Sequence, residues 1–460
     1  MTNLLRRRLV QAAAAGLSLR PWHLLAAPRG YPRLLQGPMI GHVGPRHVTV
    51  WGRASGPYPL SVQYATDRGF TEPRTSEVVA TSEASDLTGV VRIDGLEPGT
   101  RYWYRMLVDG VVDRYQSVPY PVRTAPAGPA DFTVAFGSCA RHSIDAEQRI
   151  FEIVAREAPD LFFWLGDNVY ADAESPLAIA DEYRRQRNVR TARAVARSIP
   201  QLAIWDDHDF GYNNGDGTWP HKAGSLAVFN RYWANPSQGL ADVPGVFFEY
   251  SYAGVDFFFL DGRYHRSPND APDGPAKTML GSGQFAWLCE RLLASRAPFK
   301  VLACGSGWSL ADGPRGDTWS AFLDERNRLF DFIRDRGIDG VVCLSGDSHV
   351  GELNCIPWSE RGGYDIYDLV SSPLAQSPGA GWITQSPEIR LRQVYAGGAN
   401  VGLLRFRAGD APSLRFDLLN EWGLAPWMPL DLAATELRNG VRSWPGKIDP
   451  QLVNRAPAPG

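Results

Sequence analysis

The chain has 460 residues, of which 44% are hydrophobic, so it is long enough for two domains with a sizeable core. Its 47 Lys and Arg residues nearly balance 50 Asp and Glu residues, and the formal net charge is −3. Because binding to a phosphate backbone requires a basic face, this mixture of charges argues against nucleic acid as the main partner. The five cysteines have no paired spacing and are odd in number, so at least one free thiol is expected.

The first 30 residues resemble a twin-arginine export signal. Three consecutive arginines at 6–8 precede a run of small and apolar residues, and the pair Ala26-Ala27 offers a cleavage site. This interpretation places the protein in the periplasm or outside the cell. The alternative is a disordered basic tail, because Arg20 interrupts the apolar run. No segment of the sequence has the length and apolar character of a transmembrane span.

Residues 35–125 alternate between apolar and polar side chains with a period of two, which predicts half-buried β-strands. The clearest runs are 47–53, 60–64, 88–93 and 101–108. Short strands separated by regular turns are typical of a β-sandwich. The segment 96–102 resembles the corner of a fibronectin type III domain, with Tyr102 supplying the corner ring.

A segment rich in Pro, Ala and Gly at 121–129 is interpreted as a linker, and after it the pattern changes to alternating strands and helices. This alternation predicts an α/β catalytic domain over 130–430, followed by a tail at 431–460. The strands are continuous apolar runs, typical of parallel strands buried on both faces. In open α/β sheets the chemistry lies just outside the carboxyl ends of such strands.

Potential metal ligands follow five of these strands. The run 161–165 ends in Gly166-Asp167, and Tyr170 comes three residues later, close enough for both side chains to face one ion. The other strand ends present Cys139, Asp206-Asp207-His208, Asp261 with Arg263, and Asp347 with His349. One such Asp commonly caps the next helix, whereas this number of carboxylate, imidazole, phenolate and thiolate groups indicates a shared metal site.

Several of these segments resemble the alkaline phosphatase D family of metallophosphoesterases. They are Phe136-Gly137-Ser138-Cys139, Gly166-Asp167-Asn168-Val169-Tyr170, Trp205-Asp206-Asp207-His208-Asp209 and Leu344-Ser345-Gly346-Asp347-Ser348-His349. The resemblance extends from the sandwich domain to about residue 375, and the Gly-Asp-x-x-Tyr element is similar to that of purple acid phosphatases, whose tyrosinate binds ferric iron. The family implies a two-sheet α/β sandwich preceded by a fibronectin type III-like domain, and a hydrolase of phosphate monoesters or diesters.

The resemblance also implies two metal ions, expected to be Fe³⁺ and a divalent ion such as Ca²⁺. The implied ligands are Cys139, Asp167, Tyr170, Asp207, Asp347 and His349. Asp167 would bridge the two ions, and the thiolate, phenolate and imidazole would bind the trivalent one. Asp207 stands where many metallophosphoesterases carry Asn, and Asp347 where they carry His. These departures make the second site richer in oxygen and favour a hard cation.

In the implied mechanism, one ion activates a water molecule that attacks phosphorus in line with the leaving group. His208 is expected to protonate the leaving oxygen. Arg263 is expected to bind the non-bridging oxygens, with Arg266 as a second candidate. Asn213 is a further candidate for contact with metal or phosphate.

Each of these residues also has a purely structural interpretation. Cys139 could be a buried apolar residue, and Tyr170 could pack over a pocket. His208 could hold a loop by hydrogen bonds, and Arg263 could pair with Asp261. Two other functions stay open: a phospholipase-D-like diesterase acting on phospholipid head groups, and an extracellular binding protein whose second domain is catalytically dead.

Overall fold

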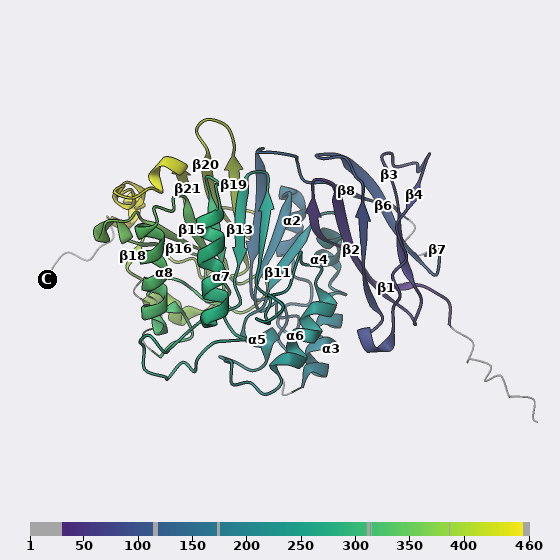
Figure 1. Ribbon diagram of the computed structural model, residues 1–460, viewed down its shortest axis with the longest axis horizontal. Helices are drawn as coiled ribbons and strands as arrows, with labels where there is room; N and C mark the ends of the chain where they lie inside the picture. Colours follow the sequence, from purple (N-terminus) through teal and green to yellow (C-terminus); the bar gives the residue numbers. More distant parts are fainter. Residues whose placement is uncertain are drawn as a thin grey trace, which may run out of the picture.

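The described part of the chain comprises an N-terminal β region and a larger α/β region (Figure 1). The computed structural model describes residues 30–113, 118–172, 175–310, 313, 315–385 and 387–453. The expected export signal lies outside these residues. Within them, no helix combines the length and the apolar character needed to cross a bilayer.

The N-terminal region consists of two small antiparallel sheets. One contains β1 (Leu34–Gly44), β2 (His47–Ala54) and β5 (Thr88–Asp94). The other contains β4 (Arg74–Thr75), β3 (Leu60–Ala65), β6 (Arg101–Val108) and β7 (Val111–Val112), with β8 (Tyr120–Arg123) beside β6. The Tyr102 hydroxyl accepts a hydrogen bond from the backbone N–H of Glu97 at 2.9 Å. This bond is the tyrosine corner expected of a fibronectin-like sandwich.

Two mixed sheets form the centre of the α/β region. The first has the order β11 (Gln201–Ile204), β10 (Leu161–Leu165), β9 (Phe132–Gly137), β19 (Asn400–Arg407), β20 (Ser413–Asn420) and β21 (Leu430–Ala433). The second has the order β12 (Phe248–Tyr252), β13 (Val255–Phe259), β14 (Lys300–Ala303), β15 (Val341–Ser345), β17 (Ile366–Val370), β16 (Glu352–Ile356) and β18 (Ile389–Arg390). Strands β9, β10 and β11 are parallel, and so are β13, β14, β15 and β17. Because β21 belongs to the first sheet, the segment predicted as a tail from residue 431 onward begins inside that sheet.

Aromatic side chains fill the space between the two sheets. Phe163 of β10 meets Phe257 and Phe259 of β13, with ring centroids 5.0 and 4.8 Å apart. Phe257 also meets Phe406 of β19, with a centroid separation of 5.9 Å. Contacts between strands of different sheets confirm the predicted α/β sandwich.

Helices flank the sheets. They are α2 (Ile150–Glu157), α3 (Pro176–Gln186), α4 (Arg190–Ala196), α5 (Asp207–Phe210), α6 (Lys222–Tyr232), α7 (Gly281–Ala294), α8 (Leu323–Asp335) and α9 (Pro450–Val453). Figure 1 shows α7 and α8 beside strands of the second sheet, whereas α2 and α4 lie toward the N-terminal region. The buried residues of α2 fall at 150, 151, 153 and 154, the helical spacing of an amphipathic face.

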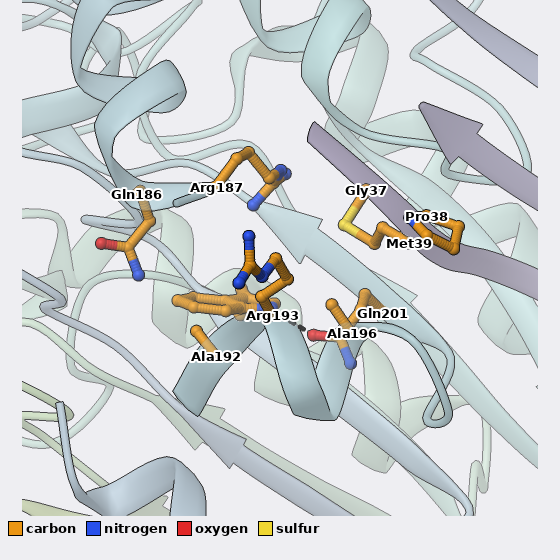
Figure 2. A pocket seen from close by; sticks show the side chains of 10 residues that line it. Gly37, Pro38, Met39, Gln186, Arg187, Ala192, Arg193, Ala196 and Gln201 are labelled. Atoms are coloured by element: carbon orange, nitrogen blue, oxygen red, sulfur yellow. Dashed lines mark hydrogen bonds between the residues drawn. The ribbon is translucent and has the colours of Figure 1, made fainter. Parts of the chain in front are cut away.

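The N-terminal region packs closely against the α/β region. The indole N–H of Trp51 donates to the Arg231 carbonyl at 2.7 Å, and the Tyr104 hydroxyl donates to the Arg197 carbonyl at 2.9 Å. Figure 2 shows a cavity at this interface, lined by residues 37–39 of β1 on one side and by residues of α3 and α4 on the other. Its volume of about 20 Å³ accommodates one water molecule and no larger ligand.

Candidate metal centre

Donor side chains meet at the carboxyl ends of parallel strands from both sheets. Three groups of donor atoms lie there, and within each group all atoms are within 4.8 Å of one another. The groups are Cys139, Asp167 and His349; Asp167, Asp207 and His208; and Asp206, Asp207 and Asp347. Because Asp167 and Asp207 each belong to two groups, the three groups form one continuous cluster. The structure therefore brings five of the six expected ligands into this cluster, and Tyr170 joins it through His349 as described below.

The loops that carry these donors have an unusual backbone. Four donor residues adopt left-handed conformations, with φ between 51° and 63°: Cys139, Asp167, Asp347 and His349. Such conformations are unfavourable for residues other than glycine and concentrate at functional sites. Close approach of the loops also requires glycine. A Cβ atom at Gly166 would lie 2.5 Å from the Cβ atom of Asp206, and one at Gly346 would lie 2.3 Å from Ser138 Oγ.

The softer donors lie on one side of the cluster. Cys139 Sγ is 3.5 Å from Asp167 Oδ2, and the Tyr170 hydroxyl is 3.1 Å from His349 Nε2. Burial, together with the nearby Asp167, raises the pKa of both the Cys139 thiol and the Tyr170 phenol well above their usual ranges. Burial lowers the pKa of His349 to about 4, so its imidazole is neutral and able to bind a cation. A highly charged cation here would stabilise thiolate and phenolate, which the protein alone does not.

Four carboxylates crowd the rest of the cluster. Burial raises the pKa of Asp167 and Asp347 well above the usual range, neighbouring carboxylates adding to the effect, and it raises the pKa of Asp206 to about 6. Two buried oxygens, Asp206 Oδ2 and Asp207 Oδ1, accept no hydrogen bond from the part of the chain that the structure describes. Buried carboxylate oxygens without donors are unfavourable unless a cation satisfies them. The donor set therefore fits a hard divalent cation.

His208 lies at the edge of this cluster, on the ring of Tyr170. The two ring centroids are 4.2 Å apart, and the backbone N–H of His208 donates to Asp167 Oδ1 at 3.3 Å. Its Nδ1 pairs with the carboxylate of Asp172, which leaves Nε2 facing Asp207 at 4.0 Å. Burial alone would lower the pKa of His208, but the carboxylates of Asp167, Asp172 and Asp207 outweigh it and raise the pKa to about 10. Asp172 was missed from the sequence because it lies in a loop, five residues after Asp167.

The structure places Arg263 differently from its expected role at the substrate phosphate. Its side chain is 0% exposed and is enclosed by Asp206, Asp317 and the Gly215 carbonyl, with Asp207 Oδ1 3.8 Å away. A guanidinium with no exposed surface supports the carboxylates from behind and does not reach a substrate. Its side chain also forms no ion pair with Asp261 in the described structure; the Arg263 backbone N–H donates to Asp261 Oδ1 instead.

Arg266 is also unsuited to substrate contact. It is 1% exposed, and its guanidinium donates to Asp317 Oδ1 at 2.8 Å and to Asn269 Oδ1 at 2.7 Å. Asp317 thus pairs with both arginines. It lies in an irregular loop with no strand before it, so no sequence pattern pointed to it.

Asn213 is exposed, and the contact to the cluster comes from its neighbour. The backbone N–H of Asn214 donates to Asp207 Oδ2 at 2.6 Å, and Asn214 adopts a left-handed conformation with φ 60°. A backbone donor of this kind leaves no mark in the sequence.

Asp209 joins two of the ligand-bearing loops. Its carboxylate accepts hydrogen bonds from the backbone N–H of Asp206 at 2.7 Å, the backbone N–H of Asn168 at 3.3 Å and the Tyr183 hydroxyl at 3.1 Å. Asp209 is 0% exposed, and burial raises its pKa to about 7. The loops after β10 and β11 are therefore held at a defined separation by one buried side chain.

Comparisons with known proteins show related sequences and folds. The chain is 26% identical over 315 residues to alkaline phosphatase D of Bacillus subtilis (strain 168), which covers 56% of this chain and 52% of that protein. The chain thus spans about half the length of this curated relative. It is similar in fold to a structure described as PhoD, with a TM-score of 0.73 and 18% identity, covering 88% of this chain and 91% of that one. A purple acid phosphatase from yellow lupin (Lupinus luteus) seeds has a TM-score of 0.61 and 12% identity, covering 93% of this chain and 77% of that one.

Family models cover both regions of the chain. The model described as PhoD-like phosphatase matches residues 134–388, and the model of the N-terminal domain of PhoD-like phosphatase matches residues 20–126. The first match contains every donor of the cluster and spans more than half of the chain. This chain therefore belongs to the PhoD-like phosphatase family.

Proposed function

We propose that the chain is a metal-dependent hydrolase of phosphate esters with two cations at the cluster. The observation that carries this proposal is the convergence of seven buried or half-buried donor residues in one cluster, where two carboxylate oxygens have no hydrogen-bond donor among the described residues. Two such oxygens next to several other donor atoms favour a bound cation over pure loop capping. The name of the curated relative, alkaline phosphatase D, points to the same chemistry.

The proposed ligands divide by chemistry. Thiolate, phenolate and imidazole from Cys139, Tyr170 and His349 suit Fe³⁺, while carboxylates from Asp207 and Asp347 suit Ca²⁺ or another hard divalent ion. Asp167 belongs to both halves of the cluster and is assigned as the bridging ligand. Asp206 adds a further carboxylate to the divalent half, although the sequence did not single it out from Asp207.

When bound, the cations would lower the pKa of a water molecule and withdraw charge from the phosphoryl group. The protein side chains supply the proton. The Asp172 carboxylate accepts a hydrogen bond from Nδ1–H of His208 and so fixes the orientation of the ring, with Nε2 turned toward the cluster. From Nε2 the imidazolium can protonate the leaving oxygen as its bond to phosphorus breaks. We further propose that the first 30 residues direct export.

The test is elemental analysis of the full chain purified without chelator, combined with a substrate panel. The panel contains 4-nitrophenyl phosphate, bis(4-nitrophenyl) phosphate and a phosphatidylcholine. We expect two metal ions per chain and hydrolysis of at least one small ester. Faster hydrolysis of the phospholipid than of either small ester would favour the lipid diesterase. A metal-free protein that hydrolyses none of them would favour a binding protein and overturn the proposal.

A further inference from the structure

Binding of a phosphate ester calls for a cation that the substrate can reach. The two arginines expected in this role, Arg263 and Arg266, are buried and both pair with Asp317. Arg141 has the exposure that they lack, because 37% of its side chain is accessible.

The backbone places Arg141 at the edge of the cluster. It follows Cys139 by two residues, and its own N–H donates to the Ala375 carbonyl at 2.8 Å. The N–H of the intervening Ala140 donates to the Asp167 carbonyl at 2.9 Å. The segment that carries Arg141 is therefore bound to the loop of Asp167 on one side and to the loop after β17 on the other, which fixes the backbone position of Arg141.

The guanidinium lies over the candidate ligand Tyr170. Its central carbon is 5.2 Å from the centroid of the Tyr170 ring, whose hydroxyl is 3.1 Å from His349 Nε2. On the other side it approaches Asp172, the partner of His208, with a closest N···O distance of 4.0 Å. The charge of Arg141 is thus held between the softer donors and the His208–Asp172 pair, next to the position expected for the reacting phosphate.

The hydrogen-bonding capacity of Arg141 is largely unused. Nε donates to Ser143 Oγ at 3.2 Å, and Asp172 is too far from the terminal nitrogens for a hydrogen bond. Within the described part of the chain, the two terminal nitrogens make no hydrogen bond. A planar pair of N–H donors with this freedom can converge on one terminal oxygen of a phosphoryl group.

We propose that Arg141 binds a terminal phosphoryl oxygen of the substrate and selects phosphate monoesters over diesters. This inference rests on the proposed function of the cluster. A monoester has three terminal oxygens and two negative charges at alkaline pH, whereas a diester has two terminal oxygens and one charge. With one oxygen taken at each of two cations, only a monoester keeps a terminal oxygen for Arg141. Arg141 is therefore a substrate-binding residue whose effect depends on substrate class.

The experiment compares wild-type protein with Arg141→Ala, Arg141→Lys and Arg149→Ala. Arg149 is a matched control because it is exposed and pairs only with Glu147 among the described residues. Metal content is measured first, and inorganic phosphate is then titrated calorimetrically into each metal-loaded protein. Values of kcat/KM follow for 4-nitrophenyl phosphate and bis(4-nitrophenyl) phosphate.

A lost hydrogen bond to a charged group predicts phosphate binding weakened about 10- to 100-fold in Arg141→Ala. The monoester kcat/KM should fall by a similar factor, mainly through KM, while the diester value changes less than about threefold. Arg141→Lys keeps the charge but not the planar pair of donors, so it should recover part of the loss. Arg149→Ala should match the wild type, and metal content should be equal in all four proteins.

Three results would overturn the proposal: unchanged phosphate affinity in Arg141→Ala, equal losses for monoester and diester, or loss of metal from that variant. The last would make Arg141 part of the support of the metal site. If the wild type hydrolyses neither ester, the proposed function of the cluster fails, and the phosphate titration still decides whether Arg141 binds phosphate.

Discussion

Replacement of Asp167 with Asn should stabilise the metal-free protein while it abolishes metal binding and hydrolysis. Asp167 is 1% exposed, and its ligand atom lies within 4.8 Å of those of Asp207 and His208. At that separation two carboxylates repel by about 3.5 kcal/mol for an effective dielectric constant of about 20. Attraction to His208 and partial protonation of Asp167 reduce this figure, so a net gain of about 1–2 kcal/mol in the free energy of unfolding is expected.

The gain should grow with pH. Burial raises the folded-state pKa of Asp167 above the unfolded value of about 4. The protonated carboxyl is therefore tolerated at low pH, and the wild type loses stability as the pH rises through the raised folded-state pKa. The Asp167→Asn variant does not titrate in this window, so its advantage should be small at pH 4 and larger at pH 8. Urea unfolding of chelator-treated protein, followed by tryptophan fluorescence at both pH values, measures the difference.

Asp261 provides the matched control, because like Asp167 it follows a buried parallel strand, here β13 of the second sheet, and it is 0% exposed. Its carboxylate accepts hydrogen bonds from the Trp205 indole at 2.8 Å and from the backbone N–H of Val246 at 3.0 Å and of Tyr264 at 2.9 Å. Asp261→Asn should therefore lower the free energy of unfolding by about 2 kcal/mol. Destabilisation of metal-free Asp167→Asn similar to that of Asp261→Asn would contradict the electrostatic explanation. Full hydrolysis by Asp167→Asn in the presence of metal would contradict the role of Asp167 as a metal ligand.

Three further predictions follow from the same cluster. Asp172→Asn should lower kcat about 10- to 100-fold for an alkyl phosphate, whose leaving group needs a proton from His208, and less for 4-nitrophenyl phosphate; equal losses would argue against proton donation. Cys139→Ser should change the visible absorption of the iron-loaded protein, and an identical spectrum would exclude the thiolate as a ligand. Asp209→Asn should lower the free energy of unfolding by about 2 kcal/mol and reduce metal occupancy, because an amide NH2 group replaces one carboxylate oxygen and then faces an N–H donor. Calorimetry measures the stability and elemental analysis measures the metal. Neither value would change if Asp209 did not hold the two loops.

The parts of the fold that follow from periodicity agree with the structure. All five residues of the run 161–165 are buried in one strand, and Tyr102 makes the corner hydrogen bond. Because parallel strands end at one edge of a sheet, the proximity of Asp167 and Asp207 also follows from the apolar runs before them. Asp347 follows a strand of the second sheet, so its place in the cluster depends on how the two sheets pack. The assignment of these residues as metal ligands stays a prediction.

The surroundings of the cluster were not predictable, because they depend on loops. The sequence places Arg263 at a strand end but does not show that Asp317, 54 residues later in an irregular segment, closes over it. Asp172 and Arg141 likewise lie in loops, and only their contacts with His208 and Tyr170 reveal their position. Side chains that enclose or border a site are set by tertiary packing, which leaves no periodic pattern in the sequence.

The central claim is that the Cys139, Asp167 and Tyr170 side chains hold one cation. The most direct measurement is an anomalous difference map, collected at the iron absorption edge, from a crystal of the chain purified without chelator. We expect a peak in direct contact with Cys139 Sγ, Asp167 and the Tyr170 hydroxyl. A protein that hydrolyses phosphate esters but shows no anomalous peak at these three groups would contradict it.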